Sequence, residues 1–360
     1  MKSKYISSLI LSFFLIFNFL FLNAQEIEFL QKFEIGSEEK QEEILFKITE
    51  VKADRDGNIF IVDYGNNCIK KFSFSGKFLK EVGRKGQGPR EMINPLNIDI
   101  DQEGNIYVND RGNRRINVYD NDLNYLRTIK LDNSISIENF FILPEDKLLV
   151  FRSARVIEDE YFYLFSNKGE YIKSFYNKFH PYVSIINSSK DIQSHLLTFV
   201  YLASISNLNQ DKTQIACAYS IPQNPYEIYL MDTNGNVIEK IKKEIKNYNP
   251  QKQKKILGYI ISKNKDKLDD RTAIIMMESL HFTKENFLVV QRKDELYNQG
   301  SFDKFLISLD IFSSEGDLIK EEMEISEKIS SIDMDNNVYT IIEDEQGISK
   351  VGVYKLKIKR

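Results

Sequence analysis

An internal repeat constrains the fold of this chain more than any other feature. The segment that begins at Val51, VKADRDGNIFIVDYGNNCIKKFSFSGKFL, aligns without a gap with IDIDQEGNIYVNDRGNRRINVYDNDLNYL, which begins at Ile98, at an offset of 47 residues. In each copy, apolar and polar residues alternate on both sides of a Gly-Asn pair, which is typical of a β-hairpin. A repeat of this length predicts that one small β-sheet recurs along the chain.

Weaker copies of this unit follow in the rest of the chain. Their first hairpins turn near Glu145, Asp211, Lys284 and Asp335. Two insertions interrupt the series, near residues 177–200 and 242–272, and without them the residues after position 24 divide into six units of about 47 residues. Six four-stranded antiparallel units predict an all-β fold, a six-bladed β-propeller.

The two ends of the chain predict how the ring closes. The last unit has a third strand at Lys350–Ile358 but no fourth strand. Ile27–Ile35 precedes the first complete unit, so we expect it to pair with Lys350–Ile358 and close the last blade without an open sheet edge. Residues 25–360 are therefore expected to form a single domain. A β-sandwich is the alternative, but an ungapped match over 29 residues argues against coincidental repeats.

The first 24 residues have the composition of an export signal. Lys2 and Lys4 precede an almost wholly apolar stretch, and the small residue Ala24 follows it. This order is typical of a secretory signal peptide, so we expect cleavage after Ala24 and an exported protein, periplasmic or secreted. An uncleaved anchor is the alternative, but the 17 residues of Ile6–Leu22, with four polar interruptions, are short for a span of about 20. No membrane span is expected after cleavage.

Charge and composition argue against several functions. The 53 acidic and 49 basic residues give a net charge of −4, whereas nucleic-acid-binding proteins normally carry a basic excess. Cys68 and Cys217 fall in opposite blades of the predicted ring, so both are expected to be unpaired. His180, His195 and His281 lack ligand spacing, and the Asp-rich turns lack the pattern of a calcium loop. We therefore predict no metal site and no other cofactor.

Two recurring carboxylates are the first candidates for catalysis. Asp63 and Asp110 each end a second strand and are each followed by Gly and Asn. They could act as an acid and a base. Asp and Asn also cap tight turns by accepting hydrogen bonds from backbone N–H groups, and the repeat itself favours this structural role. We therefore predict no catalytic residue.

The two clearest units resemble a known family. GNIYVNDRGNRRINVYD, at Gly104–Asp120, is similar to an NHL repeat, and GRKGQGPREMINP, at Gly83–Pro95, closely resembles the join between blades in a family of exported bacterial six-bladed β-propellers. The resemblance is specific for residues 48–131, and it implies the fold more firmly than any activity. The later blades depart from the Asp-x-Gly-Asn pattern.

The sequence favours a binding protein. The leading hypothesis is a non-catalytic propeller that binds a ligand or a protein outside the cytoplasm, and we expect this protein to be a monomer. One alternative is a metal-dependent hydrolase of the lactonase kind, which needs Glu, Asn and Asp ligands from several blades. Another is a surface scaffold that contacts a partner protein through the two insertions.

The arginines indicate where a ligand could bind. Eight of the twelve fall in linkers between blades or in loops between second and third strands, which emerge at one face of a propeller. Guanidinium groups bind carboxylates and phosphates through paired hydrogen bonds. We expect an anionic small molecule, glycan or acidic protein segment to bind there, and no nucleic acid. The candidate residues are Arg84, Arg90, Arg111, Arg152, Arg155 and Arg292. The alternative is that each arginine pairs with a nearby acid.

Overall fold

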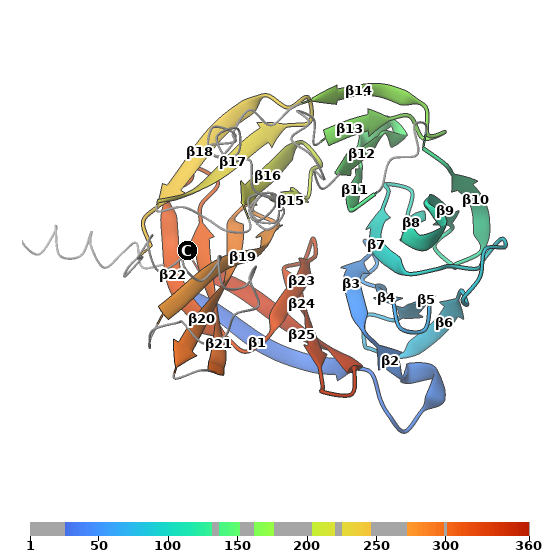
Figure 1. Ribbon diagram of the computed structural model, residues 1–360, viewed down its shortest axis with the longest axis horizontal. Helices are drawn as coiled ribbons and strands as arrows, with labels where there is room; N and C mark the ends of the chain where they lie inside the picture. The colour runs from blue at the N-terminus through green and yellow to red at the C-terminus, as the bar shows by residue number, and fades with distance from the viewer. Residues whose placement is uncertain are drawn as a thin grey trace, which may run out of the picture.

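Six antiparallel sheets surround a central axis in the computed structural model (Figure 1). The structure describes residues 26–131, 137–151, 162–175, 204–219, 225–245, 272–298 and 301–359. Each sheet has four strands that follow one another from the axis outwards, and one sheet carries an additional short strand. The protein is therefore a six-bladed β-propeller with four-stranded antiparallel blades, as the repeat predicts.

In blades 1 to 3 the strands follow one another in chain order from the innermost to the outermost. Blade 1 contains β3 (Ile48–Ala53), β4 (Ile59–Asp63), β5 (Cys68–Phe72) and β6 (Phe78–Val82). Blade 2 contains β7 (Pro95–Ile100), β8 (Ile106–Asp110), β9 (Arg115–Tyr119) and β10 (Tyr125–Ile129). Blade 3 contains β11 (Asn139–Ile142), β12 (Leu148–Phe151), β13 (Phe162–Phe165) and β14 (Tyr171–Phe175).

The other three blades follow the same order. Blade 4 contains β15 (Ser204–Leu208), β16 (Gln214–Tyr219), β17 (Tyr226–Asp232) and β18 (Val237–Lys243). Blade 5 contains β19 (Thr272–Phe282), β20 (Leu288–Asn298), β21 (Ser301–Phe312) and β22 (Leu318–Ile325). Blade 6 contains β23 (Lys328–Ile332), β24 (Asn337–Glu343), β25 (Ile348–Lys359) and β1 (Glu26–Ile35).

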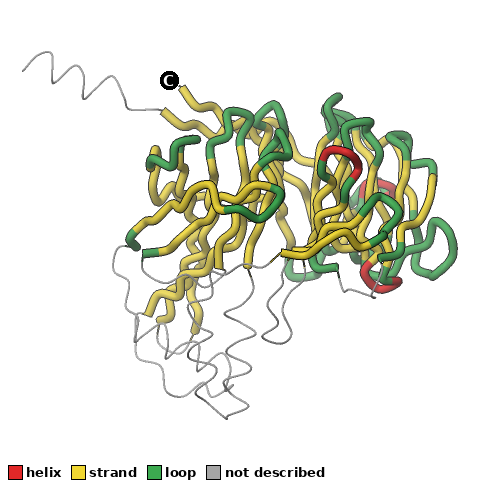
Figure 2. The backbone as a smooth tube through the Cα atoms, turned by 90° about the horizontal axis from the view of Figure 1, so that it is seen from above, coloured by secondary structure: helices red, strands yellow, loops and turns green. Residues whose placement is uncertain are grey.

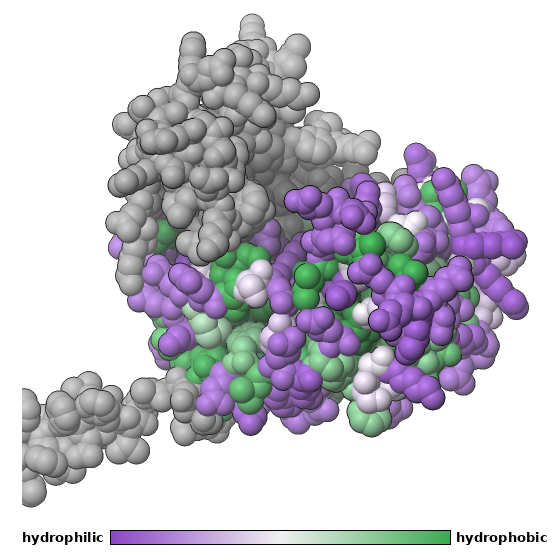
Figure 3. Space-filling view, turned by 90° about the horizontal axis from the view of Figure 1, so that it is seen from below, coloured by the Kyte–Doolittle hydropathy of each residue, from purple (hydrophilic) through white to green (hydrophobic). Residues whose placement is uncertain are grey.

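The helices of the described residues are short 3-10 turns, and none of them is long or apolar enough to cross a membrane. They are η1 (Gln41–Glu43), η2 (Arg111–Asn113) and η4 (Pro144–Asp146). In the view of Figure 3, hydrophilic side chains cover much of the described surface, with smaller apolar areas between them.

The first strand of the chain closes the ring. β1 pairs antiparallel with β25, from Ile27 opposite Ile358 to Ile35 opposite Val351, and Figure 1 shows the two strands side by side. The short strand β2 (Leu45–Phe46) pairs with the other end of β25 before the chain enters blade 1. The predicted closure of the last blade by the N-terminal strand is confirmed.

The hydrophobic core lies between the blades rather than within them. In the described part of the chain, six clusters of buried apolar side chains each join two neighbouring blades. On β4, Ile59 and Ile61 pack towards blade 6, whereas Phe60 and Val62 pack towards blade 2. A middle strand is therefore buried on both faces, and its sequence is apolar throughout instead of alternating.

Both cysteines are buried in middle strands, and neither forms a disulfide. Cys68 lies in β5 of blade 1 and Cys217 in β16 of blade 4. Burial raises the pKa of both thiols. The prediction of two unpaired cysteines is confirmed, and a buried thiol with a raised pKa is an inert core residue rather than a nucleophile.

Several sequence predictions fall outside the described residues. These include the signal peptide at 1–24, the insertion near 177–200 and nearly all of the insertion near 242–272. Of the second insertion, residues 242–243 end β18 and Thr272 begins β19. The hypothesis that the insertions bind a partner protein therefore stays a hypothesis.

Candidate functional site

The strands run between two faces of the ring (Figure 2). The turns between the first and second strands of each blade, such as residues 54–58, lie at one face, together with the turns between the third and fourth strands. We name this the turn face. The loops between second and third strands, such as residues 64–67, and the linkers between blades, such as residues 83–94, lie at the opposite face, which we name the linker face.

The repeated Asp and Gly residues join blades at the linker face. Asp110 accepts a hydrogen bond from the backbone N–H of Ile93 at 2.7 Å, and the N–H of Gly112 donates to the carbonyl of Ile93 at 2.7 Å. Asp63 makes the matching contact with the N–H of Phe46 at 3.3 Å. A Cβ atom at Gly112 would lie only 2.4 Å from the Ile93 side chain, so glycine is required there. Asp63 also accepts from the backbone N–H of Asn66 at 2.9 Å, so its predicted role as a turn cap is confirmed, whereas the backbone contact of Asp110 joins two blades.

The linker at residues 83–94 is organised around a single guanidinium group. Arg115 donates from Nε to Asp110 at 2.7 Å. Its two Nη atoms donate to the backbone carbonyls of Gln87, Gly88 and Glu91, at distances between 2.7 and 3.0 Å. Arg115 is therefore used within the fold, and it fixes the path of the chain from blade 1 to blade 2.

Three of the predicted arginines lie in segments of the linker face. Arg90 is an exposed residue of the linker itself. Arg84 lies at the start of the linker, with Nη2 2.9 Å from Glu91, and its side chain is 81% exposed. Arg111, in η2, lies 3.3 Å from Glu138. Two of the three thus pair with nearby acids, as the alternative interpretation expected.

The other predicted arginines do not join this group. Arg292 is buried in β20, and its Nε lies 2.9 Å from Asp310 in β21. Lys243 and Tyr226 of blade 4 contact the same carboxylate, at 2.7 Å each. Arg292 therefore belongs to an internal network between blades 4 and 5. Arg152 and Arg155 lie outside the described residues.

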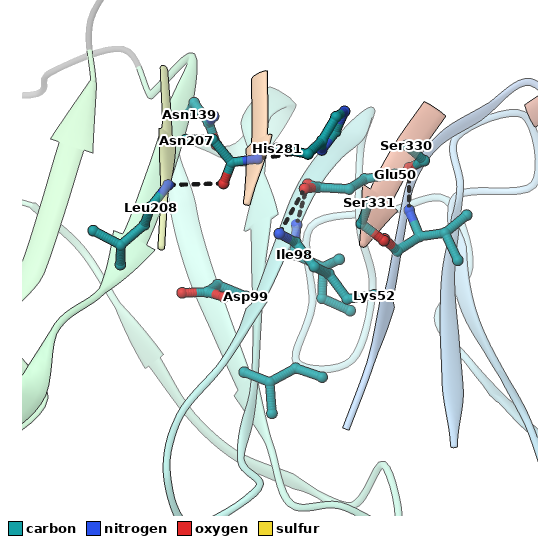
Figure 4. Close-up of polar contacts among 12 residues, drawn as sticks. Glu50, Lys52, Ile98, Asp99, Asn139, Asn207, Leu208, His281, Ser330 and Ser331 are labelled. Carbon is teal, nitrogen blue, oxygen red and sulfur yellow. Dashed lines mark hydrogen bonds and ion pairs between the residues drawn. The ribbon is translucent and has the colours of Figure 1, made fainter. Parts of the chain in front are cut away.

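Six side chains, one from each inner strand, surround the axis near the turn face. They occupy equivalent positions, two residues before the residue that opens the first turn of each blade. We name them the axial ring: Lys52, Asp99, Phe141, Asn207, His281 and Ser331. They line a cavity of about 150 Å³ (Figure 4 labels five of them). The next residue on each inner strand is apolar and packs between blades.

The six members of the axial ring are chemically different. One is an ammonium, one a carboxylate, one an aromatic ring, one an amide, one an imidazole and one a hydroxyl. The fold repeats, but the wall of the cavity does not. A cavity with different polar groups on each side can hold an asymmetric ligand in a single orientation.

The histidine of the ring is neutral, and both of its ring nitrogens are engaged. Burial, followed by the charges of Lys52 and Lys328, lowers the pKa of His281 to about 3. Ser279 donates its hydroxyl proton to Gln291 at 2.9 Å, so Nε2–H of His281 donates to Ser279 at 2.8 Å. The other ring nitrogen, Nδ1, faces the amide nitrogen of Asn207 at 3.4 Å. His281 therefore lines the cavity and is not placed to act as a general base.

The carboxylate of Glu50 lies next to Lys52 of the axial ring. Glu50 accepts a hydrogen bond from the backbone N–H of Ile98 at 3.0 Å (Figure 4). Burial raises the pKa of Glu50, although the charge of Lys52 opposes the effect. Lys52 Nζ lies 3.6 Å from Glu50, which is longer than a hydrogen bond. The ammonium of Lys52 is thus held near the axis with hydrogen-bonding capacity to spare.

The first turn of blade 4 reaches across the mouth of the cavity. It is one residue longer than the corresponding turn of the other five blades. Lys212 forms an ion pair with Asp99 of blade 2 at 3.1 Å. Gln210 donates to the carbonyls of Phe282 in blade 5, at 3.2 Å, and of Ile332 in blade 6, at 3.0 Å. This turn narrows the cavity opening and ties blade 4 to three other blades.

A comparison with protein families matches residues 28–267, two thirds of the chain, to a family described as 6-bladed beta-propeller. The chain belongs to this family. The family assignment agrees with the repeat count and with the architecture, and it names no activity. A comparison with curated proteins finds no match.

Solved structures with the same architecture show the fold alone. A presumed exported protein from Bacteroides fragilis NCTC 9343 is similar at 14% identity and a TM-score of 0.58, over 94% of this chain and 96% of that chain. A member of the duf4221 family from Bacteroides vulgatus ATCC 8482 is similar at 8% identity and a TM-score of 0.58, over 93% of this chain and 99% of that chain. At these identities, the similarity extends to the arrangement of blades and not to their side chains.

Sequence reasoning did not identify the axial ring, although one signal for it was present. At the offset of 47 residues, Lys52 aligns with Asp99, so opposite charges occupy one position of two otherwise similar units. Because the two units fold alike with opposite charges at this position, the fold of the blade does not determine which residue stands there. The other four ring positions lie in units too divergent to align in this way.

Proposed function

We propose that this six-bladed propeller is a non-catalytic, exported binding protein whose axial cavity takes a small polar ligand. The axial ring carries the proposal, because six different side chains from six blades converge on one cavity. A volume of about 150 Å³ accommodates a molecule of roughly the size of benzene. The polar wall favours a hydrophilic ligand of that size.

The hydrogen bonding of the ring supports binding over catalysis. His281 is neutral, and both of its nitrogens face partners within the wall. Asp63 and Asp110 hold the join between blades. A general base needs a free acceptor within reach of a substrate, and these groups are already engaged.

The position of Lys52 argues against a lactonase-like metal centre. A divalent ion in the cavity would lie close to the ammonium of Lys52, which belongs to the axial ring. The like charge of this ammonium opposes a second cation there. Among the described residues, no group of three His, Cys, Asp or Glu side chains is placed to hold a metal. Purified protein that contains one divalent ion per chain would favour the hydrolase instead.

Two observations support action outside the cytoplasm. The first 24 residues have the order of a signal peptide. A presumed exported protein shares the architecture over nearly the whole chain. Fractionation of cells that express the full chain tests this directly. We expect a mature protein that begins near Gln25 in the periplasm or the medium, and an uncleaved cytoplasmic product would contradict the proposal.

A screen with a blocked cavity tests the binding function. Small polar metabolites are screened for thermal stabilisation of the protein, and those that stabilise it are titrated by calorimetry. Gln102 lines the cavity at its exposed rim, whereas its neighbour Glu103 does not line it. We expect Gln102→Trp to weaken binding at least tenfold and Glu103→Trp to leave it unchanged. Equal binding by both variants would place the site elsewhere.

A further inference from the structure

We infer that the ligand of the axial cavity is a small anion, a carboxylate or a phosphate, bound by Lys52 and Arg55. This inference rests on the proposed function, since it names the chemical class of the ligand for the same cavity. The observation behind it is the unequal use of acids and bases in the cavity wall. The acids already have partners within the protein, and two of the bases have hydrogen-bonding capacity left.

Each carboxylate that lines the cavity already has partners within the protein. Four line it among the described residues: Asp54, Asp99, Asp101 and Asp333. Each accepts at least two hydrogen bonds or ion pairs from the protein. Asp54, for example, accepts from the backbone N–H of Asn58 at 2.8 Å and from the side chain of Asn121 at 2.8 Å. A cationic ligand would have to share these carboxylates with the partners that they already have.

The neutral polar groups of the ring are also largely satisfied. Ser331 donates its hydroxyl to the carbonyl of Val51 at 2.6 Å. Asn207 donates to the carbonyl of Leu280 at 2.6 Å, and its oxygen accepts from the N–H of Leu208 at 2.8 Å. These bonds tie neighbouring inner strands together. An uncharged ligand would therefore find few free partners in the ring.

The bases of the cavity are used unequally. Besides the neutral His281, three cationic side chains line it among the described residues: Lys52, Arg55 and Lys212. Lys212 is engaged by Asp99 and by the carbonyl of Ile100, at 3.1 and 2.9 Å. The ammonium of Lys52 has three N–H donors, and the contact with Glu50 at 3.6 Å is its one ion pair with a described residue. Arg55, an exposed residue of the rim, forms no hydrogen bond or ion pair with any residue that the structure describes.

The two cations with spare donors lie at successive depths of one opening. Lys52 belongs to the axial ring, and Arg55 lies three residues later, in the turn that forms the rim. An anion that enters from the turn face meets Arg55 first and Lys52 next. Hydrogen bonds between a cation and an anion are about twice as strong as those between neutral groups, so these two residues would dominate recognition.

Titration with two anions tests the inference. Inorganic phosphate and succinate are titrated separately into the mature protein by calorimetry at low salt. We expect at least one of them to bind at one saturable site per chain. The affinity should fall at least tenfold in Arg55→Gln and in Lys52→Gln. Arg55→Gln removes no contact of the fold, so it remains informative even if Lys52→Gln is unstable. Arg84→Gln is the matched control, because Arg84 is an exposed arginine of the linker face.

The outcomes separate the inference from the proposed function. Binding of phosphate alone or of succinate alone identifies the type of anion, and either supports the inference when it depends on Arg55. Loss of binding in Arg84→Gln but not in Arg55→Gln would overturn it and favour the arginines of the linker face. If neither anion binds, while an uncharged ligand binds and is lost in Gln102→Trp, the anion inference is wrong and the binding function stands. If nothing responds to Gln102→Trp, both are wrong.

Discussion

His281 shows how burial determines what a histidine in this wall does. Its pKa in the folded protein is about 3, well below the value of about 6.5 in an unfolded chain. At neutral pH His281 is neutral in the folded protein and mostly neutral in the unfolded chain, so its protonation costs the folded protein almost no stability. As the pH falls below 6.5, the unfolded chain takes up a proton that the folded protein does not, and stability is lost down to about pH 3.

This difference predicts that His281 contributes to the loss of stability in acid. We expect the free energy of unfolding to fall by up to about 1.4 kcal/mol for each pH unit between 6 and 4 because of His281. The measurement is urea unfolding at pH 7, 6, 5 and 4. The slope should be shallower in His281→Gln, whatever the stability of that variant at pH 7. The same slope in both proteins would show that His281 is not buried as described.

Asp310 is the acid on which the network between blades 4 and 5 depends. It accepts hydrogen bonds from Lys243 and Tyr226 and forms an ion pair with Arg292, and although burial opposes the effect, these partners lower its pKa. Asp310→Asn would remove the buried carboxylate that Lys243 and Arg292 share. We expect a loss of about 3–5 kcal/mol in urea unfolding at pH 7. Asp317→Asn, at an exposed turn, should change stability by less than about 0.5 kcal/mol.

At the scale of elements, the blades are joined by the Asp and Gly residues of the repeat. The Gly112→Ala variant places a Cβ atom 2.4 Å from Ile93, in a linker that Asp110 and Arg115 hold in place. We expect destabilisation of about 1–3 kcal/mol in urea unfolding, since the linker has little freedom to move. Gly65→Ala occupies the equivalent place and should behave alike. Wild-type stability in both variants would show that the join tolerates a side chain.

The elements also show how far the sequence determines this structure. The alternation around Gly57 and Gly104 predicts hairpins because it depends only on neighbouring residues. The contact of Lys212 with Asp99 joins residues that are 113 apart in the chain, and it exists only because the closed ring brings blades 2 and 4 to one axis. Local patterns therefore predict the blades, whereas the cavity wall requires the ring. For the same reason, the sequence predicts that Arg292 lies in a loop or linker, whereas the structure places it in β20 with its side chain buried.

At the scale of the whole molecule, the ring depends on its first strand. Ile27 and Phe29 of β1 pack in the cluster between blades 5 and 6, and Phe33 and Ile35 pack in the cluster between blades 6 and 1. β1 thus covers the edge of β25 and contributes to two interfaces between blades.

Removal of this strand should destabilise the entire protein. We expect deletion of residues 25–35 to lower the melting temperature by roughly 10 °C or more, because several buried side chains and a full set of strand pairings are lost. The comparison is the mature chain that begins at Gln25, followed by circular dichroism. A melting temperature that the deletion leaves unchanged would contradict closure by β1.

Among the described residues, side chains from all six blades line the axial cavity, and they differ in chemistry. The most direct measurement is a crystal structure of the mature protein grown with whichever of phosphate or succinate binds in solution. We expect density for the anion in the cavity, within about 3 Å of Lys52 Nζ and of the Arg55 guanidinium. An empty axial cavity, with the anion bound at Arg84 or Arg90 on the linker face, would contradict it.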